Sequence, residues 1–287
     1  MTSSRGRRRD RPGASRPAQG LRAALVGACL TLAACGQDAA EPPDGGGGLQ
    51  PPASALFSGQ FETIEVEVDY MAGAEPFTGS AGALGDLWQI FGDNAARLFE
   101  GTGSVVKFPS NINEMEEVDV APAESFTASA ILAIAQDHRD LLNTPERATF
   151  YALWLDGFFK DNEGAVRQDV LGVSIGDTGV IAMFKPVIES ASSPRFDGVA
   201  RFVEQTTLVH EFGHAAGLVN RGVPLTSDHH DAEHGAHCDD DRCVMFFANE
   251  GVADLRDFVL DFVVNGDTVV FGDECLADAR ALIDAAR

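Results

Sequence analysis

The sequence predicts an α+β fold in which a mixed sheet carries a central helix and a smaller helical subdomain closes the chain. Three observations lead to this prediction. Apolar and acidic side chains alternate over residues 61–70, as they do in a strand with one buried face. Apolar residues recur at helical spacing over 84–99. The run 202–219 is long and apolar enough to form the buried central helix.

The other elements are assigned in chain order from the same patterns of periodicity, turn residues and β-branched side chains. Predicted helices and strands alternate along the chain as far as a segment that is rich in glycine, aspartate and histidine. The predicted elements are a strand at 104–108, a helix at 125–142, strands within 149–159 and 170–184, a loop-rich segment at 220–244, and closing helices at 253–264 and 273–286.

Composition and charge narrow the class of protein. The chain has 287 residues, of which 45% are hydrophobic and 23% charged, as in an ordinary globular protein. It carries 21 basic and 44 acidic side chains, for a net charge of −23. Seven arginines and one acidic residue lie in residues 1–34, so the remainder has a net charge of −29. A field of that sign repels phosphate groups, which argues against a nucleic-acid partner.

The first 34 residues have the pattern of a secretory signal, with an arginine-rich start, a short apolar stretch and small residues at its end. The stretch is too short to span a membrane. It ends in Leu32-Ala33-Ala34-Cys35, which resembles a bacterial lipobox and implies lipid modification of Cys35. The predicted organisation is a signal at 1–34, a glycine- and proline-rich tether at 35–55, and a folded part at 56–287, divided into 56–219 and 220–287.

The predicted central helix contains the sequence His210-Glu211-Phe212-Gly213-His214. Residues four apart share one face of a helix, so both imidazoles can bind one zinc ion. Glu211 would then stand beside the metal as general base and later as general acid. Uncharged neighbours on both sides of the motif are consistent with a site at the floor of a cleft.

A longer pattern resembles the metzincin zinc peptidases. Gly217 lies three residues after His214, where that pattern has a glycine that turns the chain off the helix. Further on, His237 is followed by Cys238, four residues, Cys243, one residue and Met245, which resembles the archaemetzincin signature. The resemblance implies that His237 is the third zinc ligand and that Met245 forms the Met-turn beneath the metal. It also implies a metzincin-like fold with a C-terminal subdomain after that turn.

The third ligand has alternatives, because the pattern is interrupted. Its usual position holds Asn220, a poor zinc ligand, and residues 221–236 look inserted before His237. Three other histidines of the insertion remain candidates: His229, His230 and His234. A further alternative is Glu233, which lies after eighteen intervening residues from His214, as in the gluzincins. Gly222 and Pro224 argue against the helix that this glutamate would need.

The cysteines predict a single zinc ion. The archaemetzincin pattern ends in Cys-x2-Cys, which builds a second, structural zinc site, whereas this chain offers only Cys275 there. A disulfide between Cys238 and Cys243 is expected instead, because the protein is predicted to be exported. The acidic residues of the loop have two interpretations: they form a weak calcium site, or the loop is simply exposed to solvent. These residues are Asp228, Asp231 and Asp239 to Asp241.

The function expected from these features is that of a zinc-dependent endopeptidase, which hydrolyses peptide bonds outside the cytoplasm with Glu211 as general base. Its partner is a peptide or protein substrate, and its membrane contact is the lipid on Cys35 alone. The alternative is a surface binding lipoprotein that keeps zinc for structure and hydrolyses nothing. The two differ in whether the fourth position on the metal is open or filled by a protein ligand.

Overall fold

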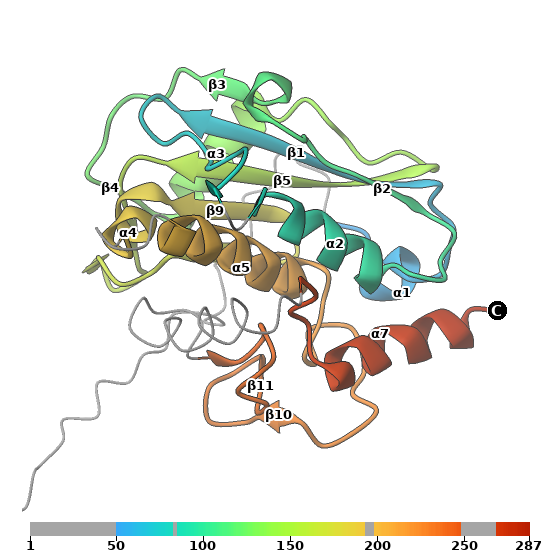
Figure 1. Cartoon of the computed structure of the whole chain (residues 1–287). Coiled ribbons are helices and arrows are strands. Elements are labelled where there is room, and N and C mark those ends of the chain that lie inside the picture. The colour runs from blue at the N-terminus through green and yellow to red at the C-terminus, as the bar shows by residue number, and fades with distance from the viewer. Residues whose placement is uncertain (1–49, 83–84, 193–197, 248–267) are drawn as a thin grey trace, which may run out of the picture. The chain divides into compact units, whose positions relative to one another are not determined.

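The computed structural model describes residues 50–82, 85–192, 198–247 and 268–287, all within one compact unit, Ala33–Arg287 (Figure 1). This unit has the mixed α+β architecture that the sequence predicts. The predicted signal and Cys35 lie outside the described residues, and so does the helix expected at 253–264. No helix within the described ranges combines the length and apolar character needed to cross a lipid bilayer.

The main sheet has six strands, in the order β2-β1-β5-β9-β8, with β3 also paired to β1. All neighbours are parallel except β8 and β9, which are antiparallel, so β8 forms one edge of a mixed sheet. The strands are β1 (Thr63–Met71), β2 (Val105–Lys107), β3 (Glu116–Val118), β5 (Arg147–Leu155), β8 (Gly172–Ile175) and β9 (Val180–Phe184).

The central strands form because their side chains suit a sheet covered on both faces. In β1 the apolar residues Ile64, Val66 and Val68 are buried, whereas Glu65 and Glu67 are half-buried, as the alternation predicts. β5 is almost continuously apolar and buried, which is typical of a parallel strand between two layers of helices. The two strands pair over eight residues, from Thr63 opposite Arg147 to Tyr70 opposite Trp154.

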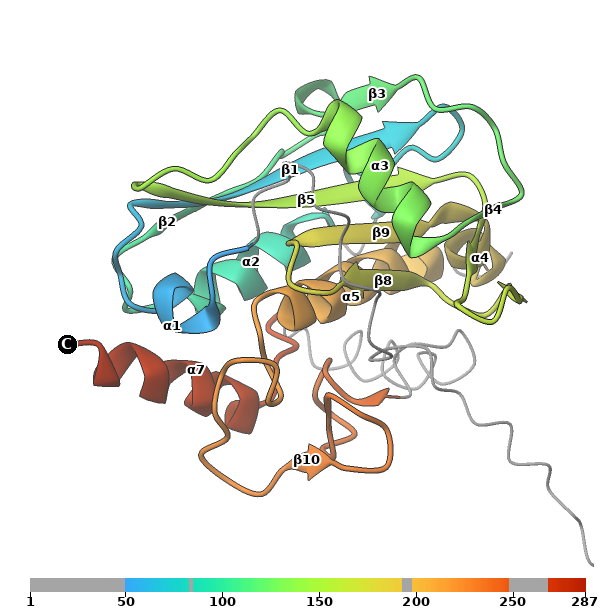
Figure 2. The same ribbon diagram turned by 180° about the vertical axis from the view of Figure 1, so that it is seen from behind.

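Helices cover both faces of the sheet. α2 (Gln89–Leu98) and α5 (Gly198–Ala215) lie against one face, and α3 (Ala128–His138) lies against the other (Figure 2). α5 is the predicted central helix, and it contacts both β8 and β9. The other helices of the described residues are α1 (Ala53–Leu56), a 3-10 turn (Ile112–Glu114), α4 (Lys185–Ser190) and α7 (Asp273–Ala285).

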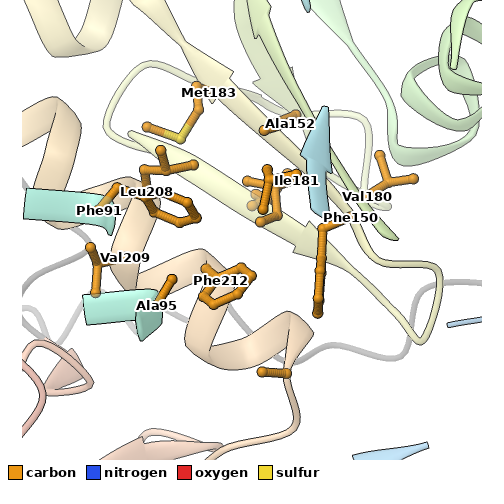
Figure 3. Close-up of a cluster of buried hydrophobic side chains, with 14 of the residues drawn as sticks. Phe91, Ala95, Phe150, Ala152, Val180, Ile181, Met183, Leu208, Val209 and Phe212 are labelled. Carbon is orange, nitrogen blue, oxygen red and sulfur yellow. The ribbon is translucent and has the colours of Figure 1, made fainter. Parts of the chain in front are cut away.

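The core between α5 and the sheet is built around Phe212 (Figure 3). Its ring centroid lies 4.7 Å from that of Phe150 on β5 and 5.1 Å from that of Phe91 on α2. All three rings are at most 1% exposed. Aromatic pairs at these distances add to the stability gained from burial alone, so α5 is held firmly against the sheet just where the His210–His214 motif lies.

The described residues also form two smaller sheets. The first consists of β4 (Ser125–Phe126), β6 (Phe158–Lys160) and β7 (Val166–Arg167), and the second of β10 (His230–Asp231) and β11 (His237–Cys238). The helix predicted at 125–142 is therefore shorter. Its first two residues belong to β4, and Thr127 caps α3 by accepting a hydrogen bond of 3.2 Å from the backbone N–H of Ala130.

Residues 50–55, which the sequence assigned to the tether, take part in the packed structure. The backbone N–H of Gln50 donates a 2.8 Å hydrogen bond to the carbonyl of Asp177. Ala53 and Leu56 of α1 are buried in the core. Packing among the described residues thus begins a few positions before Leu56.

Candidate metal centre

The C-terminal half of α5 carries the three motif residues. His210 and His214 lie one turn apart on the same face, and both are buried, with 1% and 3% exposure. Their Nε2 atoms are 3.1 Å apart. Glu211 is also buried. The helix alone therefore brings two imidazoles and a carboxylate to one place, as the spacing predicts.

The helix ends directly after the second histidine. Gly217 has a φ of +93°, in the left-handed region that favours glycine. The backbone N–H of Gly217 bonds to the carbonyl of His214, and that of Leu218 to the carbonyl of Gly213, both at 3.0 Å. This pair of bonds is a Schellman motif, which terminates a helix and reverses the chain. The turn leads the chain into the segment that returns with His237.

His237 completes a group of three imidazoles. It lies in β11, is 1% exposed, and its ring centroid is 5.3 Å from that of His210 and 5.0 Å from that of His214. One ring nitrogen of each histidine lies within 4.8 Å of the other two. The structure therefore brings together the three predicted ligands, although 22 residues separate the last two in sequence.

The protonation of these rings suits metal binding. The Nδ1 atoms of His210 and His237 lie 2.6 Å from the carbonyl oxygens of Val244 and His234. A carbonyl only accepts, so each Nδ1 carries the proton and each Nε2 keeps its lone pair. Burial, followed by the effect of the neighbouring His210 and His237, holds the pKa of His214 well below its usual value. All three rings are therefore available as neutral ligands.

The geometry of this histidine trio (His210, His214 and His237) fits a zinc ion. Zinc–nitrogen bonds of about 2.0–2.1 Å in a tetrahedron place ligand nitrogens roughly 3.3 Å apart, close to the 3.1 Å between His210 and His214. An all-imidazole set of three favours zinc over the oxygen-seeking ions calcium and magnesium. Three protein ligands leave the fourth position for water or substrate, which is the arrangement of catalytic zinc sites.

Glu211 lies between the histidine trio and the edge strand. A side-chain carbon added at Gly172 of β8 would lie 3.1 Å from Cγ of Glu211 and 2.9 Å from Cγ2 of Thr207. Glycine is therefore required at this position for β8 to approach α5 so closely. The sequence analysis did not single out Gly172, because only the tertiary contact gives this glycine a role.

Met245 lies against the helix from the opposite side. It is fully buried, and a side-chain carbon added at Gly213 would collide with its sulfur atom. The carbonyl of Met245 accepts a 2.9 Å hydrogen bond from the backbone N–H of Cys238. The neighbouring carbonyl of Val244 is the one that orients His210. The loop around Met245 therefore holds both the helix motif and β11 in place.

The structure places the alternative third ligands elsewhere. Asn220 and Glu233 are exposed, and Glu233 lies in the turn between β10 and β11 rather than on a helix. His230 and His234 bond within their own loop, through Nε2 to the carbonyl of Gly235 at 2.6 Å and through Nδ1 to Asp231 at 2.7 Å. None of these side chains joins His210 and His214 in the metal-ligating groups of the described residues.

The cysteines form a second cluster that the sequence analysis missed. Cys238, Cys243 and Cys275 are all fully buried, and they are thiols rather than the disulfide expected between the first two. The Sγ atoms of Cys243 and Cys275 are 3.6 Å apart. Nδ1 of His229 lies 3.4 Å from Sγ of Cys238. Hydrogen bonds from the other two thiols lower the pKa of Cys238, whereas the hydrogen bond with Cys238 is the largest cause that raises the pKa of Cys243 and of Cys275.

The acidic residues considered for calcium do not gather in this way. Among the described residues, only Asp239 belongs to a group close enough to share an ion, together with Cys238 and Glu274. Asp228 and Asp241 are exposed.

Comparisons with known proteins add little. No protein-family model matches the sequence, and no similar sequence was found among curated proteins. Among solved structures, the chain resembles a zinc-dependent peptidase from Methanocorpusculum labreanum, with a TM-score of 0.43 and 12% sequence identity. The match covers 75% of this chain and 99% of the other.

Proposed function

We propose that the protein is a zinc-dependent endopeptidase of the metzincin type. The observation that carries this proposal is the histidine trio, in which three buried neutral imidazoles converge beside the carboxylate of Glu211. A purely structural metal site would have four protein ligands and no need for a neighbouring carboxylate. The Met245 loop that packs under Gly213 supports the metzincin assignment.

Each residue has a distinct task in this proposal. His210, His214 and His237 hold the metal, and the carbonyls of Val244 and His234 fix the orientation of two of the rings. Zinc, when bound, supplies Lewis-acid polarisation of a peptide carbonyl and makes water more acidic. Glu211 takes the proton of the attacking water and then delivers it to the leaving amine.

The edge strand β8 supports the choice of peptide as substrate. Among the described residues, β8 ends the main sheet, and it contacts α5, so this edge of the sheet passes beside the histidine trio. An extended peptide can add to such an edge through backbone hydrogen bonds, independently of its side chains. Because Gly172 lets β8 approach Glu211 closely, a peptide on this edge would pass close to the general base.

The test compares Glu211→Gln with the wild type and with Glu233→Gln, a matched change at an exposed glutamate of the neighbouring loop. We expect Glu211→Gln to keep the metal content of the wild type and to lose at least 100-fold in cleavage of a quenched casein, since general-base catalysis contributes about 10²–10⁴-fold. Glu233→Gln should retain both properties. Loss of zinc in Glu233→Gln would instead support the gluzincin alternative.

Zinc content with no cleavage in the wild type would contradict the proposal and favour the binding lipoprotein. Loss of metal from the trio in His237→Ala would identify the third ligand. Unchanged zinc affinity in that variant would move the assignment to another residue of the loop.

We further propose that the protein is exported and anchored by a lipid on Cys35. The support is the arginine-rich, apolar and small-residue pattern that ends at Leu32-Ala33-Ala34-Cys35. In a bacterial host, the full chain should fractionate with membranes and carry an added lipid mass on its N-terminal peptide. Cys35→Ser should release it, and an unlipidated protein in the cytoplasm would contradict this proposal.

A further inference from the structure

Thr207 is a buried neighbour of the proposed general base. It lies on α5 one turn before Glu211, so the two side chains share one face of the helix. Thr207 is 3% exposed. The point that a side-chain carbon at Gly172 would occupy is 2.9 Å from Cγ2 of Thr207 and 3.1 Å from Cγ of Glu211. Both side chains therefore pack against the same point of β8.

The hydroxyl of Thr207 has no hydrogen-bond partner among the described residues, although its oxygen is buried. The preceding residue, Thr206, differs in this respect. Its hydroxyl donates to the carbonyls of Phe202 and Val203, at 3.0 Å and 3.2 Å, and so bonds back to its own helix. A buried hydroxyl without a partner lowers stability, and such groups are rare in native proteins. The hydroxyl of Thr207 therefore needs a partner of another kind.

A second buried hydroxyl lies on the facing strand. Ser174 follows Gly172 by two positions in β8, so both residues point to the same side of the sheet. This is the side that α5 covers, because the strand partners of Gly172 and Ser174 are Met183 and Ile181, which face α5 (Figure 3). The hydroxyl of Ser174 is also buried and has no partner among the described residues.

We propose that the hydroxyls of Thr207 and Ser174 hold a buried water molecule against the carboxylate of Glu211. A buried water typically makes about three hydrogen bonds to polar groups that would otherwise be unpaired. Two hydroxyls and a carboxylate supply such a set, because a carboxylate can accept several hydrogen bonds at once. The inference rests on the peptidase function proposed above, in which Glu211 moves the proton.

This water gives Thr207 a part in catalysis without contact to substrate. A general base must stay within hydrogen-bond reach of the proton that it takes, and a small displacement of the base slows the reaction. The water fixes the carboxylate of Glu211 from the side of β8. Thr207 and Ser174 are therefore positioning residues, which act on the reaction only through Glu211.

The first test removes single hydroxyls from the full chain and measures cleavage of a quenched casein together with zinc content. We expect Thr207→Val to lower kcat by about 10-fold, a part of the 10²–10⁴-fold that general-base catalysis contributes. KM and zinc content should stay at the wild-type values. Thr207→Ser, which keeps the hydroxyl and loses the methyl group, should retain most of the wild-type kcat. Thr206→Val is the matched control and should leave kcat unchanged.

The second test does not depend on activity. Urea unfolding compares Thr207→Val in the wild-type background and in Glu211→Leu, which has no polar group to receive the water. If one water joins the two residues, the shift of the urea midpoint caused by Thr207→Val should differ between the backgrounds, because the two changes are coupled. The shift caused by Thr206→Val should be the same in both.

The outcomes separate this inference from the peptidase proposal. Equal shifts for Thr207→Val in the two backgrounds would overturn the shared water, whether or not the protein cleaves casein. A kcat that falls as far in Thr207→Ser as in Thr207→Val would overturn it too, since packing alone would then explain the loss. A wild type that cleaves nothing would contradict the peptidase proposal, and the urea midpoints would still decide on the water. Ser174→Ala, which reaches the same water from β8, replaces Thr207→Val in both tests if that variant does not fold.

Discussion

Asp69 departs from the alternation of β1, because its carboxyl group is only 2% exposed in a position where the pattern expects an exposed acid. It accepts a 2.7 Å hydrogen bond from the hydroxyl of Tyr151. Burial raises the pKa of Asp69 to about 7, despite that hydrogen bond. The folded protein therefore holds a proton there between about pH 4 and pH 7, which the unfolded chain releases.

This raised pKa predicts that the protein becomes less stable as pH rises through that window, because the unfolded state binds fewer protons. Asp69→Asn keeps an oxygen for the Tyr151 hydroxyl without the titration. We expect the difference in unfolding free energy between pH 5 and pH 8 to shrink in Asp69→Asn by roughly 1–3 kcal/mol. Urea unfolding at both pH values measures it, and an unchanged difference would show that Asp69 titrates normally.

At the residue scale, sequence analysis can relate residues that are close along the chain, but not residues that only the folded structure brings together. His210, Glu211 and His214 are related by helix geometry alone, so their spacing predicts that they lie together. His237 was predicted as a zinc ligand from its resemblance to a known signature, and that role stays a prediction. His229 could not be assigned, because its partner Asp278 lies 49 residues away and four histidines within nine residues look alike in sequence.

Among the elements, α4 and α5 are joined by a buried ion pair. Nζ of Lys185 lies 2.7 Å from Oε2 of Glu204, and both side chains are at most 3% exposed. Oε1 of Glu204 accepts a 2.6 Å hydrogen bond from the backbone N–H of Phe77, whose ring lies 3.2 Å beneath the Lys185 ammonium. The pair therefore attaches the loop after β1 to the helix that carries the histidine motif.

Removal of one partner should be strongly destabilising, because it leaves an unpaired charge in the core. We expect Lys185→Met to lower the unfolding free energy by about 3 kcal/mol or more. Lys185→Met/Glu204→Gln should recover part of that loss. Lys107→Met, the same change at an exposed lysine, should stay within roughly 0.5 kcal/mol of the wild type. Denaturant unfolding compares the four proteins, and a cost for Lys185→Met no larger than that of Lys107→Met would contradict the prediction.

The elements themselves were largely predictable, and their boundaries less so. The run 149–159 looks like one strand, yet β5 ends at Leu155 and β6 begins at Phe158. The chain changes sheets at Gly157, where an added side-chain carbon would lie 2.7 Å from the ring of Phe126 on β4. The pattern shows that both halves are apolar, but the choice of partner strand depends on contacts that are distant in sequence.

At the scale of the whole molecule, the large net negative charge lowers the stability of the folded protein. Self-repulsion among 44 acidic groups lowers stability at low ionic strength, and salt screens it. We expect the midpoint of thermal unfolding to rise by a few degrees (on the order of 2–5 °C) between 10 mM and about 0.5 M NaCl. Glu62→Lys/Glu163→Lys, which reverses two exposed charges, should show a smaller rise. A midpoint that does not respond to salt would contradict this prediction.

The arrangement of the whole sheet was outside the reach of sequence patterns. The apolar runs indicate strands, but they do not reveal that β1 pairs in parallel with β2, β3 and β5. Parallel strands must be joined by a crossover connection. Here the connections include α2 and α3, which pack on opposite faces of the sheet. The α+β class could therefore be predicted, whereas strand order and register could not.

Because β11 has only two residues, insertions and deletions at this strand affect the residues of both clusters. Neighbouring residues of a strand face opposite sides, and here the two residues serve different clusters, nitrogen-only for His237 and sulfur-rich for Cys238. A slip of one position would put Cys238 in the place of His237 and Asp239 in the place of Cys238, or, in the other direction, Ala236 in the place of His237 and His237 in the place of Cys238. The pairs His230–Cys238 and Asp231–His237 hold the register. Deletion or duplication of one residue within β11 would therefore disable both clusters together.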